Sequence, residues 1–130
     1  MIVWTRLVHI DGLDDKNAAF QLLESANGGL TAGMIMLMTS VGAPIFEEMF
    51  FRGFLLTPVW LRVRPWVGMA AVSIFFAGLH PVTDWGAIFV LGMGFAYWRQ
   101  RTHSITPGIV AHALQNGLTS LIASVSLSLN

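Results

Sequence analysis

Four polar side chains stand out because they occur within otherwise apolar stretches of the sequence. They are Glu47, His80, His112 and Asn116. Carboxylate, imidazole and amide groups are the side-chain types that exchange protons, ligate metal ions and donate hydrogen bonds in catalytic sites. His112 and Asn116 are four residues apart, so on a helix both project from one face. These residue types predict a functional site if neighbouring helices bring them together.

Glu48 and Arg52 lie beside Glu47 and have a simpler explanation. A glutamate four residues before an arginine is the favourable order for an ion pair on a helix, so we predict that Glu48 and Arg52 neutralise each other. Glu47 is turned about 100° away from Glu48 around the helix and is left without a built-in partner. An ionisable residue at the bilayer centre costs about 2.5–3.5 kcal/mol, so an unpaired one indicates a functional site.

Each of the remaining polar residues also has a purely structural interpretation. His80 could be a residue at a helix end that is hydrogen-bonded to a carbonyl group. His112 and Asn116 could be hydrogen-bonding groups that hold two helices together. One unpaired glutamate, two histidines and one asparagine on three helices at similar depth are harder to explain in this way. The combination therefore favours function over structure.

The composition indicates a membrane protein. Of the 130 residues, 55% are hydrophobic and only 11% are charged, and the net charge is zero. A soluble domain carries about 25% charged residues, and a nucleic-acid-binding protein needs a basic face. We therefore expect an all-α fold, a polytopic bundle of about four transmembrane helices embedded in the lipid bilayer, with no nucleic-acid partner. The expected spans are 28–58, 65–83, 85–99 and 105–128, and we expect Pro44 and Pro58 to kink the first.

Arginines suggest the orientation of these spans. Arg62 and Arg64 separate the first two, and Arg99 and Arg101 separate the last two, which places both loops on the cytoplasmic side by the positive-inside rule. Residues 1–27 are expected to form an extramembrane segment, and residues 28–130 the membrane core. We expect an integral membrane protein, in the cell membrane if the source is prokaryotic.

Three motifs resemble a known family. In chain order they are Glu47-Glu48-x-x-x-Arg52, Phe76-x-x-x-His80 and His112-x-x-x-Asn116. Together they resemble the CPBP family of intramembrane proteases, which includes the CAAX prenyl endoproteases and the Abi proteins. The resemblance covers about residues 30–125. Members usually carry further helices before the first motif, so we leave open whether this chain works alone, as an oligomer or with partner helices.

The resemblance implies an endopeptidase that cleaves a peptide bond in a membrane-associated peptide or protein substrate, a class that includes prenylated substrates. It assigns Glu47 and His80 to the activation of water, His112 and Asn116 to the oxyanion, and Glu48 and Arg52 to support of the helix. Two histidines and a glutamate also match a catalytic zinc set. Zinc held by Glu47, His80 and His112 therefore remains one alternative, and a mechanism that uses Glu and His alone is the other.

Three other functions are compatible with the same residues. The first is a non-enzymatic membrane protein of the Abi type, acting in immunity or partner binding. The second is axial haem ligation by His80 and His112, in which Glu47 would have no evident role. The third is a proton or metal path, for which four short helices leave little room for alternating access.

Overall fold

The structure is a computed structural model that describes residues 25–26 and 28–128, and within them it is helical, with no strand. Most of the predicted extramembrane segment 1–27 lies outside the described residues. Five elements follow one another without a break as one helix, Gly29–Trp60. They are α3 (Gly29–Leu37), η1 (Met38–Gly42), α4 (Ala43–Glu48), η2 (Met49–Leu55) and α5 (Leu56–Trp60). The remaining elements are α6 (Pro65–Gly78), the short 3₁₀ turn η3 (Val82–Asp84), α7 (Trp85–Thr102) and α8 (Thr106–Ser128).

The all-α prediction is confirmed, and helices occupy all four predicted spans. Two boundaries differ by more than two residues. The second helix ends at Gly78 rather than at residue 83, because a turn and Pro81 follow it. The third helix runs on to Thr102, where His103 adopts a left-handed conformation with φ of 54° and ends it. Among the described residues, Gly29–Trp60 is the helix long and apolar enough to cross a membrane, and Pro65–Gly78 is a shorter apolar helix.

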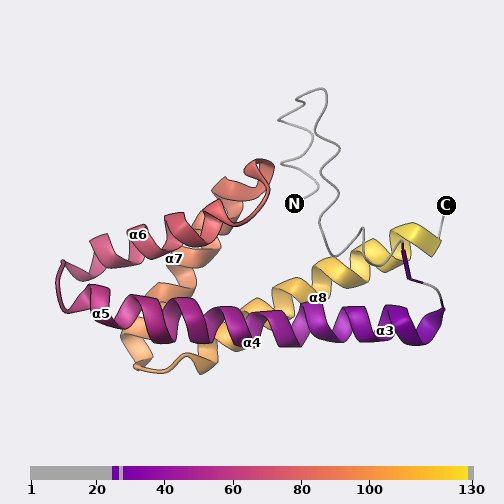
Figure 1. Ribbon diagram of the computed structural model, residues 1–130, viewed down its shortest axis with the longest axis horizontal. Helices are drawn as coiled ribbons and strands as arrows, with labels where there is room; N and C mark the ends of the chain where they lie inside the picture. Colours follow the sequence, from indigo (N-terminus) through magenta and orange to yellow (C-terminus); the bar gives the residue numbers. More distant parts are fainter. Residues whose placement is uncertain (1–24, 27, 129–130) are drawn as a thin grey trace.

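The predicted kinks at Pro44 and Pro58 are wrong. The first helix passes through both prolines, and Figure 1 shows it as a nearly straight rod. At Pro44 the reason lies in the π-helical turn η1 just before it, which adds one residue to the helical turn. A proline normally clashes with the carbonyl four residues earlier, and the wider turn accommodates the ring without a bend.

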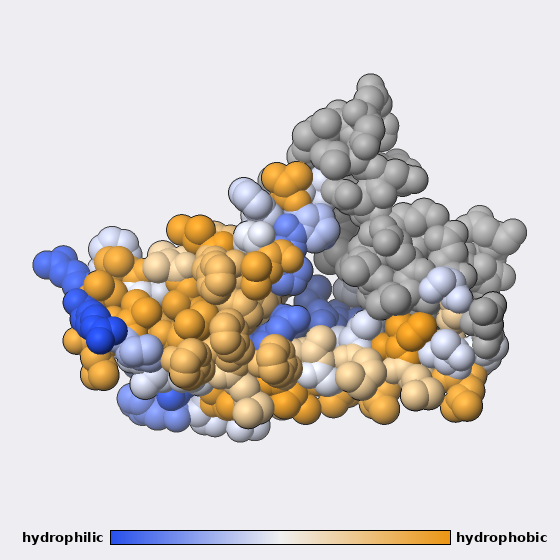
Figure 2. Space-filling view, viewed as in Figure 1, coloured by the Kyte–Doolittle hydropathy of each residue, from blue (hydrophilic) through white to orange (hydrophobic). Residues whose placement is uncertain are grey.

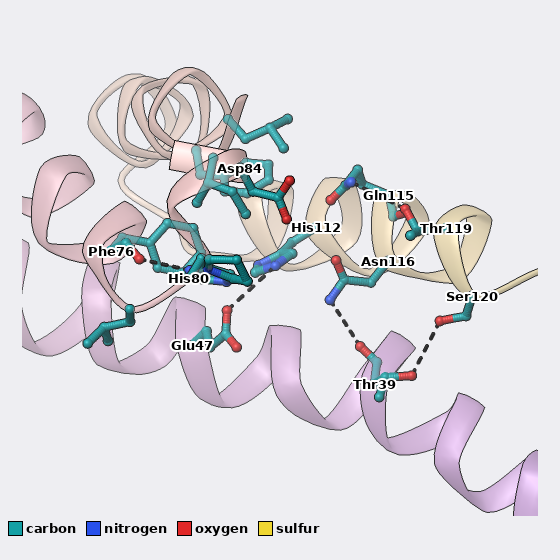
Figure 3. Close-up of a pocket in the computed structure, with 15 residues that line it drawn as sticks. Thr39, Glu47, Phe76, His80, Asp84, His112, Gln115, Asn116, Thr119 and Ser120 are labelled. Atoms are coloured by element: carbon teal, nitrogen blue, oxygen red, sulfur yellow. Dashed lines mark hydrogen bonds and ion pairs between the residues drawn. The ribbon is translucent and has the colours of Figure 1, made fainter. Parts of the chain in front are cut away.

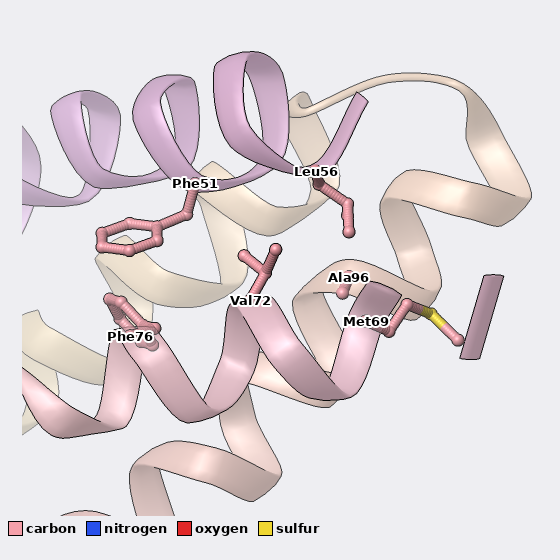
Figure 4. Close-up of a cluster of buried hydrophobic side chains, with 6 residues drawn as sticks. All are labelled: Phe51, Leu56, Met69, Val72, Phe76 and Ala96. Carbon is pink, nitrogen blue, oxygen red and sulfur yellow. The ribbon is translucent and has the colours of Figure 1, made fainter. Parts of the chain in front are cut away.

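The other helices pack against this rod in two groups (Figure 1). α6 and α7 form an antiparallel pair on its C-terminal half, and α8 lies along η1 and α4. Side chains from η2, α5, α6 and α7 meet in a small apolar core, shown in Figure 4. This core consists of Phe51, Leu56, Met69, Val72, Phe76 and Ala96. The two groups diverge away from the rod, and the candidate site lies where they separate.

The distribution of polarity is inverted relative to a soluble protein. Large apolar side chains point outward from every long helix, among them Leu30, Phe46, Val90 and Leu114, each at least 67% exposed. Charged and polar side chains are buried instead, including Glu48, Arg52 and His112. Figure 2 shows apolar residues over most of the visible face and a group of hydrophilic residues in the hollow between the helices. This surface is suited to contact with lipid.

Candidate active site

A cavity of about 310 Å³ brings together the four residues singled out in the sequence. Glu47 comes from α4, His80 follows the end of α6, and His112 and Asn116 project from α8 (Figure 3). The far wall is formed by η3 and α7, with Asp84, Ile88, Leu91 and Phe95. The convergence of the three motifs on one cavity is the arrangement that the sequence predicted.

His112 lies between the two adjacent glutamates. Its Nδ1 is 3.2 Å from Glu48 Oε1, and its Nε2 is 3.6 Å from Glu47 Oε2. A carboxylate only accepts hydrogen bonds, so Nδ1 donates to Glu48 and the Nε2 edge faces Glu47 and the cavity. Glu47 Oε2 is buried and accepts no hydrogen bond from the described residues. The glutamate predicted to lack a counter-ion therefore has a histidine within ion-pair distance, although not within a hydrogen bond.

The predicted ion pair between Glu48 and Arg52 is confirmed. Arg52 Nη1 is 3.0 Å from Glu48 Oε1, and both side chains are fully buried. Arg52 Nη2 also donates to the carbonyl of Gly92 at 3.2 Å. The guanidinium carbon lies 4.5 Å from the centre of the Phe76 ring and 5.3 Å from that of Phe95. Two aromatic faces thus add cation–π attraction to the ion pair.

Glu48 has a second contact that the sequence did not reveal. The same Oε1 that binds Arg52 also accepts the hydrogen bond from His112. The chain Arg52–Glu48–His112 therefore connects the structural ion pair to the cavity. The His112 ring is further fixed by Phe95, which stacks on it at 5.1 Å, and by the edge of Phe76 at 5.9 Å. The one sequence signal for this contact is that Glu47 and Glu48 are adjacent. Two adjacent glutamates place a carboxylate near any group that faces that turn of the helix.

His80 is held by its own helix. Its Nδ1 donates to the carbonyl of Phe76 at 2.9 Å, and its ring packs edge-on against the Phe76 ring at 4.9 Å. The indole of Trp85 donates to the His80 carbonyl at 2.8 Å. The structural interpretation of His80 is therefore correct as far as Nδ1 is concerned. Nε2 is the ring nitrogen that remains for a ligand in the cavity.

Asn116 donates from Nδ2 to the carbonyl oxygen of Thr39 at 3.0 Å (Figure 3). The Thr39 hydroxyl lies 3.4 Å from that of Ser120. These residues, with Gln115 and Thr119, form a polar end of the cavity along α8. Asn116 therefore forms the hydrogen bond between helices that its structural interpretation describes. Its amide also lines the cavity.

A second cavity, of about 380 Å³, shares Glu47 and His80 with the first. The rest of its wall is apolar and consists of Phe46, Phe50, Phe51, Phe76 and Leu79. Phe46 and Leu79 are largely exposed, so this groove opens on the apolar outer surface of the helices. Glu47 and His80 therefore stand at the border between a polar cavity and an aromatic groove.

The donor chemistry for a metal ion is only partly matched by the geometry. Both histidines donate Nδ1–H to an oxygen acceptor, Glu48 or the Phe76 carbonyl, which is the outer-shell pattern of metal-bound histidines. However, the described residues contain no group of three His, Asp or Glu side chains close enough together to hold a metal ion. The predicted set Glu47, His80 and His112 does not form such a group among them.

A substitution at Gly108 tests how tightly the buried Glu48 side chain is packed. A Cβ atom at Gly108 would lie 2.7 Å from Glu48 Oε2 and 3.7 Å from the Phe95 Cβ, so Gly108→Ala should push the carboxylate off His112. We expect the free energy of unfolding to fall by about 1–3 kcal/mol. Gly117→Ala, on the same helix, would meet only Ser40 at 3.8 Å and should be tolerated. Equal thermal stability of the two variants in detergent would contradict this packing.

Comparison with known proteins points to one family. The sequence profile described as "Type II CAAX prenyl endopeptidase Rce1-like" matches residues 29–118, which contain all of the motifs discussed above. Neither the curated proteins nor the solved structures compared with the chain gave a significant match. The matched region begins with the first helix and ends two residues beyond Asn116.

Proposed function

The chain belongs to the Rce1-like family of type II CAAX prenyl endopeptidases, and from this premise we propose that it hydrolyses a peptide bond in a membrane-associated substrate. The observation that carries the proposal is the environment of Glu47. Its Oε2 atom is buried, free of hydrogen bonds from the described residues and 3.6 Å from His112 Nε2, in a cavity shared with His80 and Asn116. A carboxylate with an open acceptor site beside two imidazoles is suited to activate water.

In the proposed reaction, Glu47 accepts a proton from a water molecule as the water oxygen attacks the scissile carbonyl carbon. His80 assists by accepting the second hydrogen bond of the water through Nε2, because its Nδ1–H is already used by Phe76. The carbonyl oxygen then carries the negative charge. When the tetrahedral intermediate collapses, the C–N bond breaks and the proton held by Glu47 moves to the leaving nitrogen.

Asn116 and His112 are proposed to stabilise the oxyanion. Asn116 has two amide hydrogens, of which one is used by the Thr39 carbonyl, and His112 can donate from Nε2 when its ring carries both protons. A preoriented donor of this kind contributes about 2.7–4 kcal/mol to the transition state. Glu48 and Arg52 are then positioning residues, because they hold the His112 ring through Nδ1.

The border position of Glu47 and His80 supports an amphipathic substrate. An apolar group can occupy the aromatic groove from the lipid side, while the peptide backbone lies in the polar cavity along α8. Prenylated peptides present this combination, and they are therefore the class to test first. Zinc remains a proposal on the donor chemistry of His80 and His112 alone, and chelation is the direct way to test it.

The test is a cleavage assay with the purified chain in proteoliposomes, on matched peptides with and without a prenyl group. We expect cleavage of the prenylated peptides, and a loss of about 10²–10³ in kcat for His112→Ala. The same assay with a chelator, together with metal analysis of the purified protein, would show whether cleavage requires zinc. If the wild-type protein cleaves none of the peptides, the proposal fails and the non-enzymatic alternative is favoured. If His112→Ala cleaves at the wild-type rate, the proposed role of His112 at the oxyanion fails.

A further inference from the structure

The first π turn leaves one backbone carbonyl without its usual partner. In an α-helix the N–H of Ala43 would donate to the Thr39 carbonyl, but here it donates to Met38, five residues back. At that spacing the next N–H able to reach Thr39 belongs to residue 44. That residue is Pro44, which has no N–H. The Thr39 carbonyl thus has neither an α-type nor a π-type donor from its own helix, and Asn116 Nδ2 donates to it instead at 3.0 Å.

The second π turn of the same helix is similar in one respect, although residue 57, five after Arg52, is Thr and keeps its N–H. The N–H of Leu56 donates to the Phe51 carbonyl and passes over that of Arg52. Arg99, from α7, then donates from Nε to the Arg52 carbonyl at 3.3 Å. In both turns, a side chain of a neighbouring helix takes the carbonyl that the Ala43 or Leu56 N–H passes over. A buried carbonyl needs a partner, and these two bonds tie α8 and α7 to the π turns of the rod.

The bond to Thr39 also fixes which way round the Asn116 amide lies. A carbonyl oxygen can only accept, so the NH₂ group must face the rod that carries Glu47, as Figure 3 shows. The second amide hydrogen then remains for a ligand in the cavity that Asn116 lines. We infer that Pro44 is a positioning residue, which keeps the Thr39 carbonyl free to hold the Asn116 amide in its donating orientation. This inference rests on the proposed function, in which Asn116 binds the oxyanion.

Pro44→Ala tests the inference. The alanine supplies an N–H that can bind the Thr39 carbonyl, or it lets the turn return to α-helix, in which Ala43 occupies that carbonyl. We expect kcat on the cleaved peptide to fall about tenfold and KM to stay within about twofold, because the lost interaction forms in the transition state. The matched control is Pro58→Ala, an exposed proline of the same rod outside the cavity, which should keep the wild-type kcat. A wild-type kcat for Pro44→Ala would overturn the inference.

A double-mutant comparison separates positioning from general damage to the fold. In an Asn116→Ala background, Pro44→Ala should cause no further loss of kcat, whereas an equal loss in both backgrounds would overturn the inference. A second measurement does not need activity. In ¹⁵N-labelled protein in micelles, the Asn116 side-chain amide, assigned by its loss in Asn116→Ala, should exchange slowly in wild type and Pro58→Ala. It should exchange faster in Pro44→Ala, and unchanged protection there would overturn the inference even if the chain proved to have no peptidase activity.

Discussion

Replacement of Glu47 by glutamine should abolish peptide cleavage without unfolding the protein. Glutamine has nearly the same shape but cannot accept a proton from water, and removal of a general base costs about 10²–10⁴ in rate. Because Glu47 Oε2 accepts no hydrogen bond from the described residues, the substitution breaks no hydrogen bond of that atom. We therefore expect kcat to fall by that factor while the thermal unfolding temperature in detergent stays near that of wild type.

Two further measurements make this prediction specific. Glu47→Asp keeps the carboxylate but shortens its reach, so it should recover part of the activity that Glu47→Gln loses. Glu47 borders both cavities, and glutamine has nearly the same shape. The affinity for an uncleaved substrate analogue should therefore be similar in wild type and Glu47→Gln. Turnover by purified Glu47→Gln at the wild-type rate would rule out Glu47 as the base, whatever the role of the histidines.

Several features of the site follow from local sequence rules. The length of the apolar stretches predicted the four helical spans. The spacing of four residues predicted the ion pair of Glu48 with Arg52 and the common face of His112 and Asn116. These rules work because they depend only on the geometry of one helix, 3.6 residues per turn. The meeting of the three motifs in one cavity was predicted from their similar depth along three spans, and the family resemblance implied it as well.

Other features could not be predicted because they depend on the contact between helices. The hydrogen bond of His112 to Glu48 requires the relative register of α8 and α4, which the spacing within each helix does not contain. The π turns are another example, since the shift of one residue depends on which N–H meets which carbonyl. The sequence showed Pro44 and suggested a kink. Only the hydrogen bonds show that the π turn accommodates the proline and that Asn116 donates to the Thr39 carbonyl.

Removal of one member of the buried ion pair should destabilise the protein strongly. Glu48 and Arg52 are both fully buried, and a charge left without its partner in such a place costs about 3–5 kcal/mol. We expect Glu48→Leu and Arg52→Met each to lower the free energy of unfolding by about that amount. Among the described residues, the Gly92 carbonyl is then the hydrogen-bond acceptor left to the guanidinium between Phe76 and Phe95 in Glu48→Leu. Unfolding in detergent with increasing denaturant is the measurement.

The double variant Glu48→Leu/Arg52→Met separates the two roles of Glu48. Replacement of both charges by apolar side chains removes the penalty of the unpaired charge, so stability should return toward wild type and the two losses should not add. Activity should not return, because His112 Nδ1 would no longer have the carboxylate that accepts its hydrogen bond. Additive losses of stability would show that the two residues are not coupled. A stable double variant with wild-type kcat would show that Glu48 serves only to neutralise Arg52 and does not position His112.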